Sequence, residues 1–412
     1  MLKVRHAKRW WMAALVFAAT VVNYLDRQTL SVAAPVLREQ FHMSDTGYSR
    51  VVSAFLLAYT VMNGVSGPLI DRLGTRVGYA LCMAWWSLAS MLHALARGTV
   101  SLAVCRFLLG MGEAGNWPAG VKVVAEWFPE QERALASGFF NSGSSVGAIL
   151  APPLIAWMIL RHGWRSAFVV TGLVGAVWLA VWLSIYKMPT AESATAQQST
   201  TAARVHRPVA KLFRTRFVWG FTVAKAFIDP VWYFYIFWFP EYLKEVRHFS
   251  LAQIGALAWI PFVIAGLGNL LGGLVGALLL RWGVSPAIAG KLASTLFILC
   301  MLAAIPAVYA HSPFVSMGFV SLAMMGYTGT LANMLAFPSS VFPKELVGSV
   351  YGIASMGAGF GGMVTTLIAG WAIDHFSYIP VFIGFGLLPL IGALLIWTLL
   401  GPLSKQAFWD QA

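Results

Sequence analysis

The chain has 412 residues, of which 59% are hydrophobic and only 10% are charged. Apolar runs near the ~20 residues that cross a bilayer recur along its whole length, which excludes a soluble globular protein. The formal net charge of +13 would suit a nucleic-acid-binding protein. However, most Lys and Arg residues fall in loops expected on the same side of the membrane as the N-terminus. By the positive-inside rule, this bias predicts a membrane protein with both termini in the cytoplasm and no nucleic-acid partner.

The apolar segments predict an all-α membrane protein with twelve transmembrane helices. The expected centres of these helices lie near Ala19, Ala58, Trp86, Gly112, Ser145, Val174, Ala226, Leu267, Leu296, Met325, Gly359 and Leu387. Residues 189–215 are rich in Ser, Thr, Ala and Gln and then basic, so they are interpreted as a cytoplasmic linker. This linker divides the chain into two expected six-helix bundles, residues 1–188 and 216–412.

The two expected bundles share short sequence patterns in the same order. Phe128 lies ten residues before Gly138, Phe342 lies ten residues before Gly352, and a proline follows each Phe. An internal repeat of this kind is typical of transporters in which two pseudo-symmetric bundles rock around a site at the bilayer midplane. We therefore expect the halves to have the same topology.

The first expected helix contains two adjacent opposite charges in the string Asn23-Tyr24-Leu25-Asp26-Arg27. A charged side chain inside the hydrocarbon costs about 2.5–3.5 kcal/mol on insertion scales, so such side chains normally face a protein interior or a water-filled cavity. The functional hypothesis makes Arg27 a clamp for an anionic substrate and Asp26 a proton carrier. The alternative is a buried ion pair that holds two helices together.

The fourth expected helix carries Arg106 and Glu113, which are seven residues apart and therefore share one helical face. Glu113 is interpreted as a second proton carrier, whereas the role of Arg106 stays open between site and structural pair. Neutral polar groups in the spans either contact a hydroxyl-rich substrate or tie helices together. Those assigned to the substrate are Tyr24, Tyr59, Asn63, Asn116 and Asn333.

The end of the second expected helix carries a glycine-rich string with interspersed charges, which is interpreted as a conformational latch. Its gating residues are Gly67, Asp71, Arg72, Gly74 and Arg76. The glycines permit a tight turn and close helix approach, and the charged side chains can pair across the boundary between the bundles. A phosphate-binding loop is excluded because no strand precedes the string and no Lys-Ser/Thr follows it.

The seventh expected helix contains Lys225 and Asp229, whose spacing of four favours an intrahelical ion pair. Pro230 follows and weakens the local backbone ladder, as in the broken helices of transporters. Trp232 begins an aromatic run that can stack on a sugar face or simply pack. Substrate binding and structural pairing both remain open for Lys225 and Asp229.

Metal, disulfide and enzyme chemistry find no support in the sequence. Cys82, Cys105 and Cys300 lie in apolar helices without metal-ligand spacing, and the eight His residues are dispersed. An enzyme would need a nucleophile beside a base, or a metal cluster. We therefore expect no catalytic residue, no metal and no cofactor beyond a coupling proton.

The chain resembles the major facilitator superfamily, whose loop signature between the second and third helices is similar to residues 67–76. Within that superfamily it is similar to the anion:cation symporter family over almost all its length. The strings that carry the resemblance are residues 23–27, 112–119, 126–129 with Glu132-Arg133, and 229–234. The last string looks most like the hexuronate transporter branch, whose seventh helix carries a basic residue four before an acidic-Pro pair.

This resemblance implies proton-coupled symport of a sugar acid such as glucuronate or galacturonate across the inner membrane. It implies that Asp26 and Glu113 are the protonatable pair, that Arg27, Tyr24 and Tyr59 contact the substrate, and it adds Arg133 to the gating residues. We expect a monomer in the lipid bilayer whose partner is a small organic anion. Alternatives are symport of another carboxylate (an aldonate such as galactonate, tartrate or an aromatic acid) or a membrane nutrient sensor. Proton number, and sodium in place of protons, also remain open.

Overall fold

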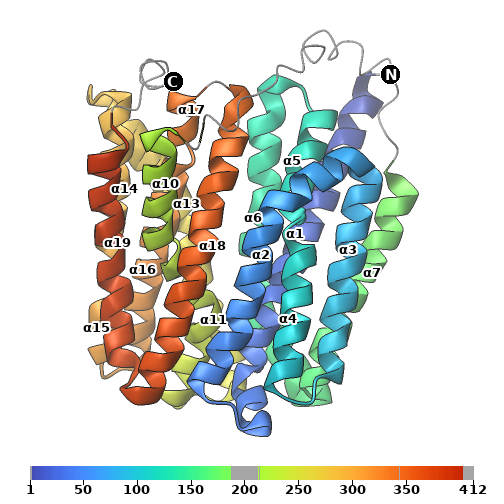
Figure 1. Ribbon diagram of the computed structural model, residues 1–412, viewed down its shortest axis with the longest axis vertical. Helices are drawn as coiled ribbons and strands as arrows, with labels where there is room; N and C mark the ends of the chain where they lie inside the picture. Colours follow the sequence, from blue (N-terminus) through green and yellow to red (C-terminus); the bar gives the residue numbers. More distant parts are fainter. Residues whose placement is uncertain (1, 187–211, 213, 343, 402–412) are drawn as a thin grey trace.

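A computed structural model describes residues 2–186, 212, 214–342 and 344–401. Within these ranges all regular structure is helical, and the helices run up and down between two ends of the molecule (Figure 1). We call the end at which the first helix begins the terminal face, and the opposite end the loop face. The predicted boundaries at residues 188–189 and 215–216 fall in or beside the undescribed segment, and the described residues on its two sides belong to different halves of the molecule.

The first half contains α1 (Leu2–Phe41), α2 (Asp45–Leu73), α3 (Thr75–Leu92), the short 3₁₀ turn η1 (His93–Leu95), α4 (Thr99–Glu113), α5 (Asn116–Trp127), α6 (Glu130–His162) and α7 (Trp164–Ile185). The second half contains α10 (Arg216–Ile228), α11 (Pro230–Glu245), α12 (Leu251–Leu257), α13 (Ile260–Arg281), α14 (Pro286–Met301), α15 (Ala304–Tyr309), α16 (Pro313–Met334), α17 (Phe337–Val341), α18 (Lys344–His375) and α19 (Tyr378–Leu399). In five places two consecutive helices form one crossing with a short break. The described residues therefore make six crossings in each half, which confirms the predicted all-α, twelve-helix fold.

The crossings differ in their content of charge. Among the described helices, eight are long and apolar enough to span a membrane by length and composition. The other crossings include α1, the α4–α5 pair and the α10–α11 pair, which carry the buried charges noted in the sequence. Charged side chains in spans mark functional sites because the bilayer penalises them. The crossings that carry buried charge are thus the ones of interest.

Two of these charged crossings are broken, and one of the breaks lies at Pro230, where the sequence predicts weakness. The α10 helix ends at Ile228, and α11 begins at Pro230, with Asp229 between them. Proline lacks the backbone N–H that would continue the α-helical ladder, and it is favoured at the first position of a new helix. The α4 and α5 helices are separated by Ala114 and Gly115. Each break places acidic side chains next to irregular backbone inside the bundle.

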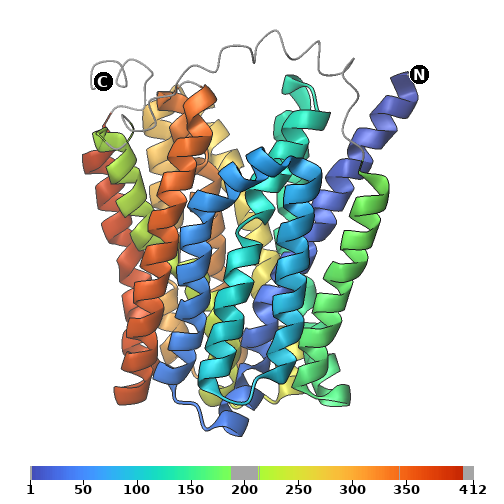
Figure 2. The same cartoon turned by 45° about the vertical axis from the view of Figure 1, so that its right-hand side comes forward.

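The two halves are in contact at the loop face. In both Figures 1 and 2, α2 and α18 lie side by side near this face and separate toward the terminal face. A Cβ atom on Gly370 would lie only 2.5 Å from the Cβ of Ser49, whereas one on Gly352 would meet nothing within 4 Å. Between α2 and α18 the interface is therefore closed at the loop face and open at the terminal face.

Candidate functional site

Arg27 and Glu113 form an ion pair at the centre of the first half. The Arg27 Nη2 donates to Glu113 Oε2 at 3.0 Å, and its Nε donates to the same oxygen at 3.2 Å. The pair joins α1 to α4, and its members are 3% and 0% exposed. Because taking two charges out of water is costly, such a pair is weak evidence for stability. The sequence left open whether these charges pair; the structure brings them together.

Asp26 points to a different set of partners. Its Oδ1 accepts a hydrogen bond from Ser90 Oγ at 2.6 Å, and that hydroxyl lies 3.1 Å from Thr171 Oγ1. These partners lie on α3 and α7, and Asp26 is fully buried. Within the described part of the chain, Oδ2 of Asp26 and Oε1 of Glu113 have no hydrogen-bond partner. Each carboxyl group thus has one oxygen free to take up a proton.

Arg106 lies between the two carboxyl groups without bonding to either. Its Nη1 donates to the backbone carbonyl of Arg27 at 3.4 Å, and the side chain interacts electrostatically with both Asp26 and Glu113. Its Nε and Nη2 have no hydrogen-bond partner among the described residues. This arginine completes a cluster of two cations and two carboxyl groups, which is electrically neutral when all four are charged.

Aromatic rings surround the Arg27 guanidinium on the side that faces the second half. Its Cζ lies 4.7 Å from the ring centroid of Tyr59, 5.1 Å from that of Tyr24 and 5.2 Å from that of Phe55. The negative faces of aromatic rings attract a cation and leave the N–H groups of a guanidinium free to donate in its own plane. These contacts fix the position of the guanidinium while they form no hydrogen bond that a substrate would have to replace.

The second half presents its own charged pair. Lys225 Nζ lies 2.6 Å from Asp229 Oδ2, and both residues are buried. This confirms the predicted intrahelical pair across the α10–α11 break. Lys225 Nζ also lies 5.2 Å from the ring centroid of Tyr351 on α18, and Trp232 stacks on Tyr327 with centroids 5.3 Å apart.

Tyr233 connects the charged groups of the two halves. It interacts electrostatically with Arg27 of the first half and with Asp229 of the second. It is half-buried, as are Trp232 and Tyr351. We call the groups that converge here the central site: Arg27, Glu113, Tyr24 and Tyr59 from the first half, and Lys225, Asp229, Trp232, Tyr233, Tyr327 and Tyr351 from the second. Asp26 adjoins this site through its electrostatic interactions with Arg106 and Glu113.

Three neutral residues that the sequence assigned to the substrate lie in different surroundings. Asn63 is half-buried on α2, one turn beyond Tyr59 toward the terminal face. The amide of Asn116 accepts from Tyr79 at 2.6 Å and donates to Thr20, all inside the first half. The Asn333 amide donates to backbone carbonyls of α13 and α16. The last two amides are occupied by contacts that tie helices together.

The glycine-rich string lies at the terminal face, away from the central site. Asp71 pairs with Lys122 of α5 at 2.8 Å, within the first half and not across to the second. Arg72 is exposed, and Arg76 donates to the carbonyl of Leu183. Gly67 is half-buried, and Gly74 has the positive φ of 79° that glycine allows at a turn. In this conformation the polar contacts of Asp71 and Arg76 lie inside the first half.

Arg133, the remaining predicted gating residue, serves the same end of the first half. Its Nε donates to the carbonyl of Phe128 and its Nη2 to the carbonyl of Ala125. These carbonyls lie at the end of α5, where the helix leaves them without intrahelical partners. Arg133 therefore caps α5 in this structure.

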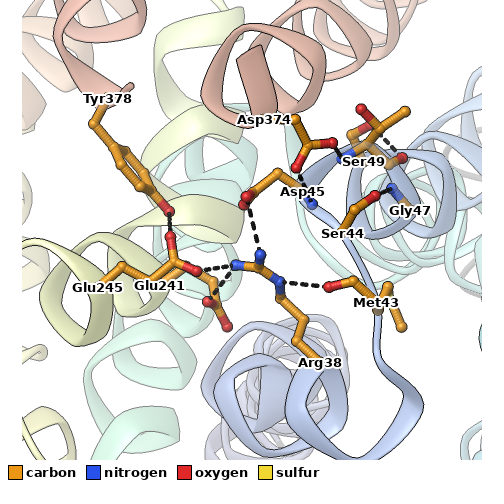
Figure 3. A network of polar contacts seen from close by, with 11 residues as sticks. Arg38, Met43, Ser44, Asp45, Gly47, Ser49, Glu241, Glu245, Asp374 and Tyr378 are labelled. Atoms are coloured by element: carbon orange, nitrogen blue, oxygen red, sulfur yellow. Dashed lines mark hydrogen bonds and ion pairs between the residues drawn. The ribbon is translucent and has the colours of Figure 1, made fainter. Parts of the chain in front are cut away.

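A network at the loop face joins the halves, and sequence reasoning missed it. Arg38 of α1 is ion-paired with Asp45, Glu241 and Glu245, at 2.9, 2.8 and 2.5 Å (Figure 3). Asp374 of α18 accepts from the backbone N–H groups of Asp45 and Thr46 at the start of α2. Residues 203 and 207 positions apart meet here, and no spacing rule predicts such partners.

The arrangement of the crossings and of the charged groups indicates the class of protein. Two six-crossing halves that meet at a charged interface inside the bilayer define a secondary membrane transporter. The sequence model of the Major Facilitator Superfamily matches residues 16–356. The chain belongs to that superfamily and is a multi-pass membrane transporter, not an enzyme.

Sequence relatives extend over most of the chain. It is 34% identical over 406 residues to the "Hexuronate transporter" of Escherichia coli (strain K12), covering 95% of this chain and 94% of that protein. It is 38% identical over 307 residues to the "Galacturonate transporter" of Dickeya chrysanthemi, covering 71% and 89%. It is 29% identical over 424 residues to a "D-galactonate transporter" of Escherichia coli O6:H1, covering 97% of each. The crystal structure of a bacterial homologue of the lysosomal transporter Spinster has the same fold, with TM-score 0.77, 18% identity and 98% coverage of both chains.

Proposed function

We propose that this protein is a proton-coupled symporter that imports a hexuronate, such as glucuronate or galacturonate, by alternating access. The observation that carries the proposal is the buried Arg27–Glu113 pair of the first half, whose guanidinium interacts with Tyr233 of the second half. A cation held inside the membrane by one carboxyl group is suited to binding another carboxylate in its place. The relatives named for hexuronate and galacturonate transport support this choice of substrate.

Coupling follows from competition for Arg27. When Glu113 takes up a proton it loses its charge, and Arg27 becomes free to bind the substrate carboxylate. Asp26, held by Ser90, supplies a second protonation site close to Arg106. Two protons moving with one monoanion carry net positive charge inward, and a membrane potential of ~100 mV adds roughly 2.3 kcal/mol of driving force per charge.

The rest of the central site would hold the sugar. We assign Tyr24, Tyr59 and Asn63 on one side and Lys225, Asp229 and Trp232 on the other to the hydroxyl groups and the ring face. Asn116 and Asn333 are left out of this assignment because their amides already bond within the protein.

Alternating access assigns different tasks to the two faces. The terminal face would be cytoplasmic in the inner membrane, so the present conformation, closed at the loop face, would open inward. In the opposite conformation, the string from Gly67 to Arg76 would approach the second half and act as the latch. Arg133 would support that latch by holding the end of α5.

The proton-carrier roles are tested by Asp26→Asn and Glu113→Gln in proteoliposomes. Each variant should lose accumulation of galacturonate under an imposed proton gradient yet retain counterflow exchange, because exchange needs no net proton movement. Glu39→Gln, which changes an exposed carboxyl group on the same helix as Asp26, is the matched control and should behave as the parent. Accumulation of substrate by both site variants would refute the proposed roles.

An aldonate is the second candidate substrate, favoured by the similarity to a D-galactonate transporter over 97% of the chain. Galactonate has a carboxylate and hydroxyl groups like a hexuronate but lacks its ring. Competition of unlabelled galactonate against labelled galacturonate uptake separates the two. Stronger inhibition by galactonate than by unlabelled galacturonate would make the aldonate the substrate.

A further inference from the structure

Resting on the proposed function, we propose that Asp229 is a specificity-determining residue that limits the central site to sugar acids with a single carboxylate. The proposal concerns the end of the site opposite Arg27. A second cation, Lys225, lies there and would attract the second carboxylate of a dicarboxylic sugar acid. Asp229 neutralises this cation, so the pair has no net charge with which to attract a second carboxylate.

The two ion pairs of the site differ in how readily each can release its cation. The Arg27–Glu113 pair joins separate helices at 3.0 Å, so a change in one helix or a proton on Glu113 can release the guanidinium. Lys225 and Asp229 are one helical turn apart on the same crossing, and their charged atoms lie 2.6 Å apart. Rigid-body movement of one half against the other leaves both pairs intact, because each pair lies within one half. Only a shift of α1 against α4, or a proton on Glu113, releases a cation. Arg27 is thus the cation that becomes available in the transport cycle, and Lys225 is not.

Asp229 also has an atom to offer the substrate. Its Oδ2 bonds Lys225, whereas its Oδ1 is buried and has no hydrogen-bond partner in the described part of the chain. A buried carboxylate oxygen accepts a hydroxyl group well, because the unpaired state is costly. The same oxygen repels a carboxylate, and like charges placed together at a desolvated interface cost several kcal/mol. Asp229 Oδ1 therefore favours the end of a sugar acid that carries hydroxyl groups, including the one derived from the aldehyde, over an end that carries a second carboxylate.

Tyrosines bring the two ends of the site into one binding region. Tyr233 interacts with both Arg27 and Asp229, and Tyr351 interacts with Lys225, Asp229 and Tyr59. Hydroxyl groups of these half-buried tyrosines can donate to or accept from the sugar without adding charge. One carboxylate at Arg27 and hydroxyl groups near Asp229 match this distribution.

The test compares three six-carbon acids on the purified full-length protein by calorimetry: galacturonate, galactonate and galactarate. Galactonate is the linear monocarboxylate control for galactarate, which differs from it by a second carboxylate. The wild-type protein should bind galactarate at least about tenfold more weakly than galactonate. Asp229→Asn should shift this ratio toward galactarate by at least about tenfold, since it exposes the charge of Lys225. The double variant Lys225→Gln with Asp229→Asn should lose that gain.

The outcomes separate this inference from the proposed function. Binding of a monocarboxylate by the wild type, together with an unchanged galactarate ratio in Asp229→Asn, overturns the role of Asp229 and leaves the proposed function standing. Equal wild-type affinity for galactarate and galactonate also overturns it, and this measurement needs no variant to fold. Binding of none of the three acids overturns the proposed function and this inference with it.

Discussion

Replacing Arg38 by glutamine should open the loop face. Arg38 reaches Asp45 within the first half and Glu241 and Glu245 of α11 in the second (Figure 3). In Arg38→Gln, Glu241 has only 1% of its surface exposed in the closed interface, so there it must either hold an unpaired charge or take up a proton. Separation of the halves returns this carboxylate to water. The substitution therefore raises the free energy of the closed state more than that of the open state.

The size of the effect follows from burial. Removing one partner of a buried ion pair costs about 3–5 kcal/mol. The Arg38 side chain is 12% exposed, which favours the lower end of that range. A change of about 3 kcal/mol shifts the ratio of closed to open molecules by more than about 100-fold.

Cysteine labelling measures this shift. Ser49 lies on α2 where it packs against Gly370 of α18, and it is fully buried. A Ser49→Cys reporter, in a background without Cys82, Cys105 and Cys300, should react with a membrane-impermeant maleimide only when the loop face opens. Arg38→Gln should raise the labelling rate strongly. Glu245→Gln is the control: its carboxylate is 34% exposed, and a pair of this kind contributes about 0–1 kcal/mol, or at most roughly fivefold.

Equal labelling rates in Arg38→Gln and its parent would refute the reasoning, provided that both proteins melt at similar temperatures. Equal effects of Arg38→Gln and Glu245→Gln would show that burial of Glu241 does not set the strength of the contact.

Two further substitutions test packing between helices. Asn333→Leu removes the amide that bonds α13 to α16 and should cost about 1–3 kcal/mol of stability. The loss should be seen as a lower melting temperature in detergent. Asn269→Leu, which replaces an exposed residue, should leave the melting temperature unchanged. Gly370→Leu adds a side chain whose Cβ alone would lie 2.5 Å from the Cβ of Ser49. This substitution should hinder closure of the loop face and reduce galacturonate uptake about tenfold or more. Gly384→Leu, where a Cβ meets nothing within 4 Å, is its control, and equal uptake by both would argue against close approach of α2 and α18 as a requirement.

The sequence by itself determined the number of the crossings. The apolar run that spans a bilayer has a fixed length, so each crossing can be recognised from its own residues. It also identified Asp26, Arg27 and Glu113 as charged residues within spans, because a charge in a hydrocarbon span is recognisable without knowledge of its neighbours. The Lys225–Asp229 pair was predictable for the same local reason, since one helical turn separates its members.

Only the tertiary structure decided which of these groups meet. Arg27 and Glu113 are 86 residues apart, and the partners of Arg38 in α11 lie more than 200 residues away. The sequence assigned Asp71 to the latch and Asn116 to the substrate, and only the fold reveals their partners in this conformation, Lys122 for Asp71 and Tyr79 for Asn116. A helix fixes which of its residues share a face, but the neighbour that this face meets depends on how the crossings pack, and that packing is a property of the whole chain.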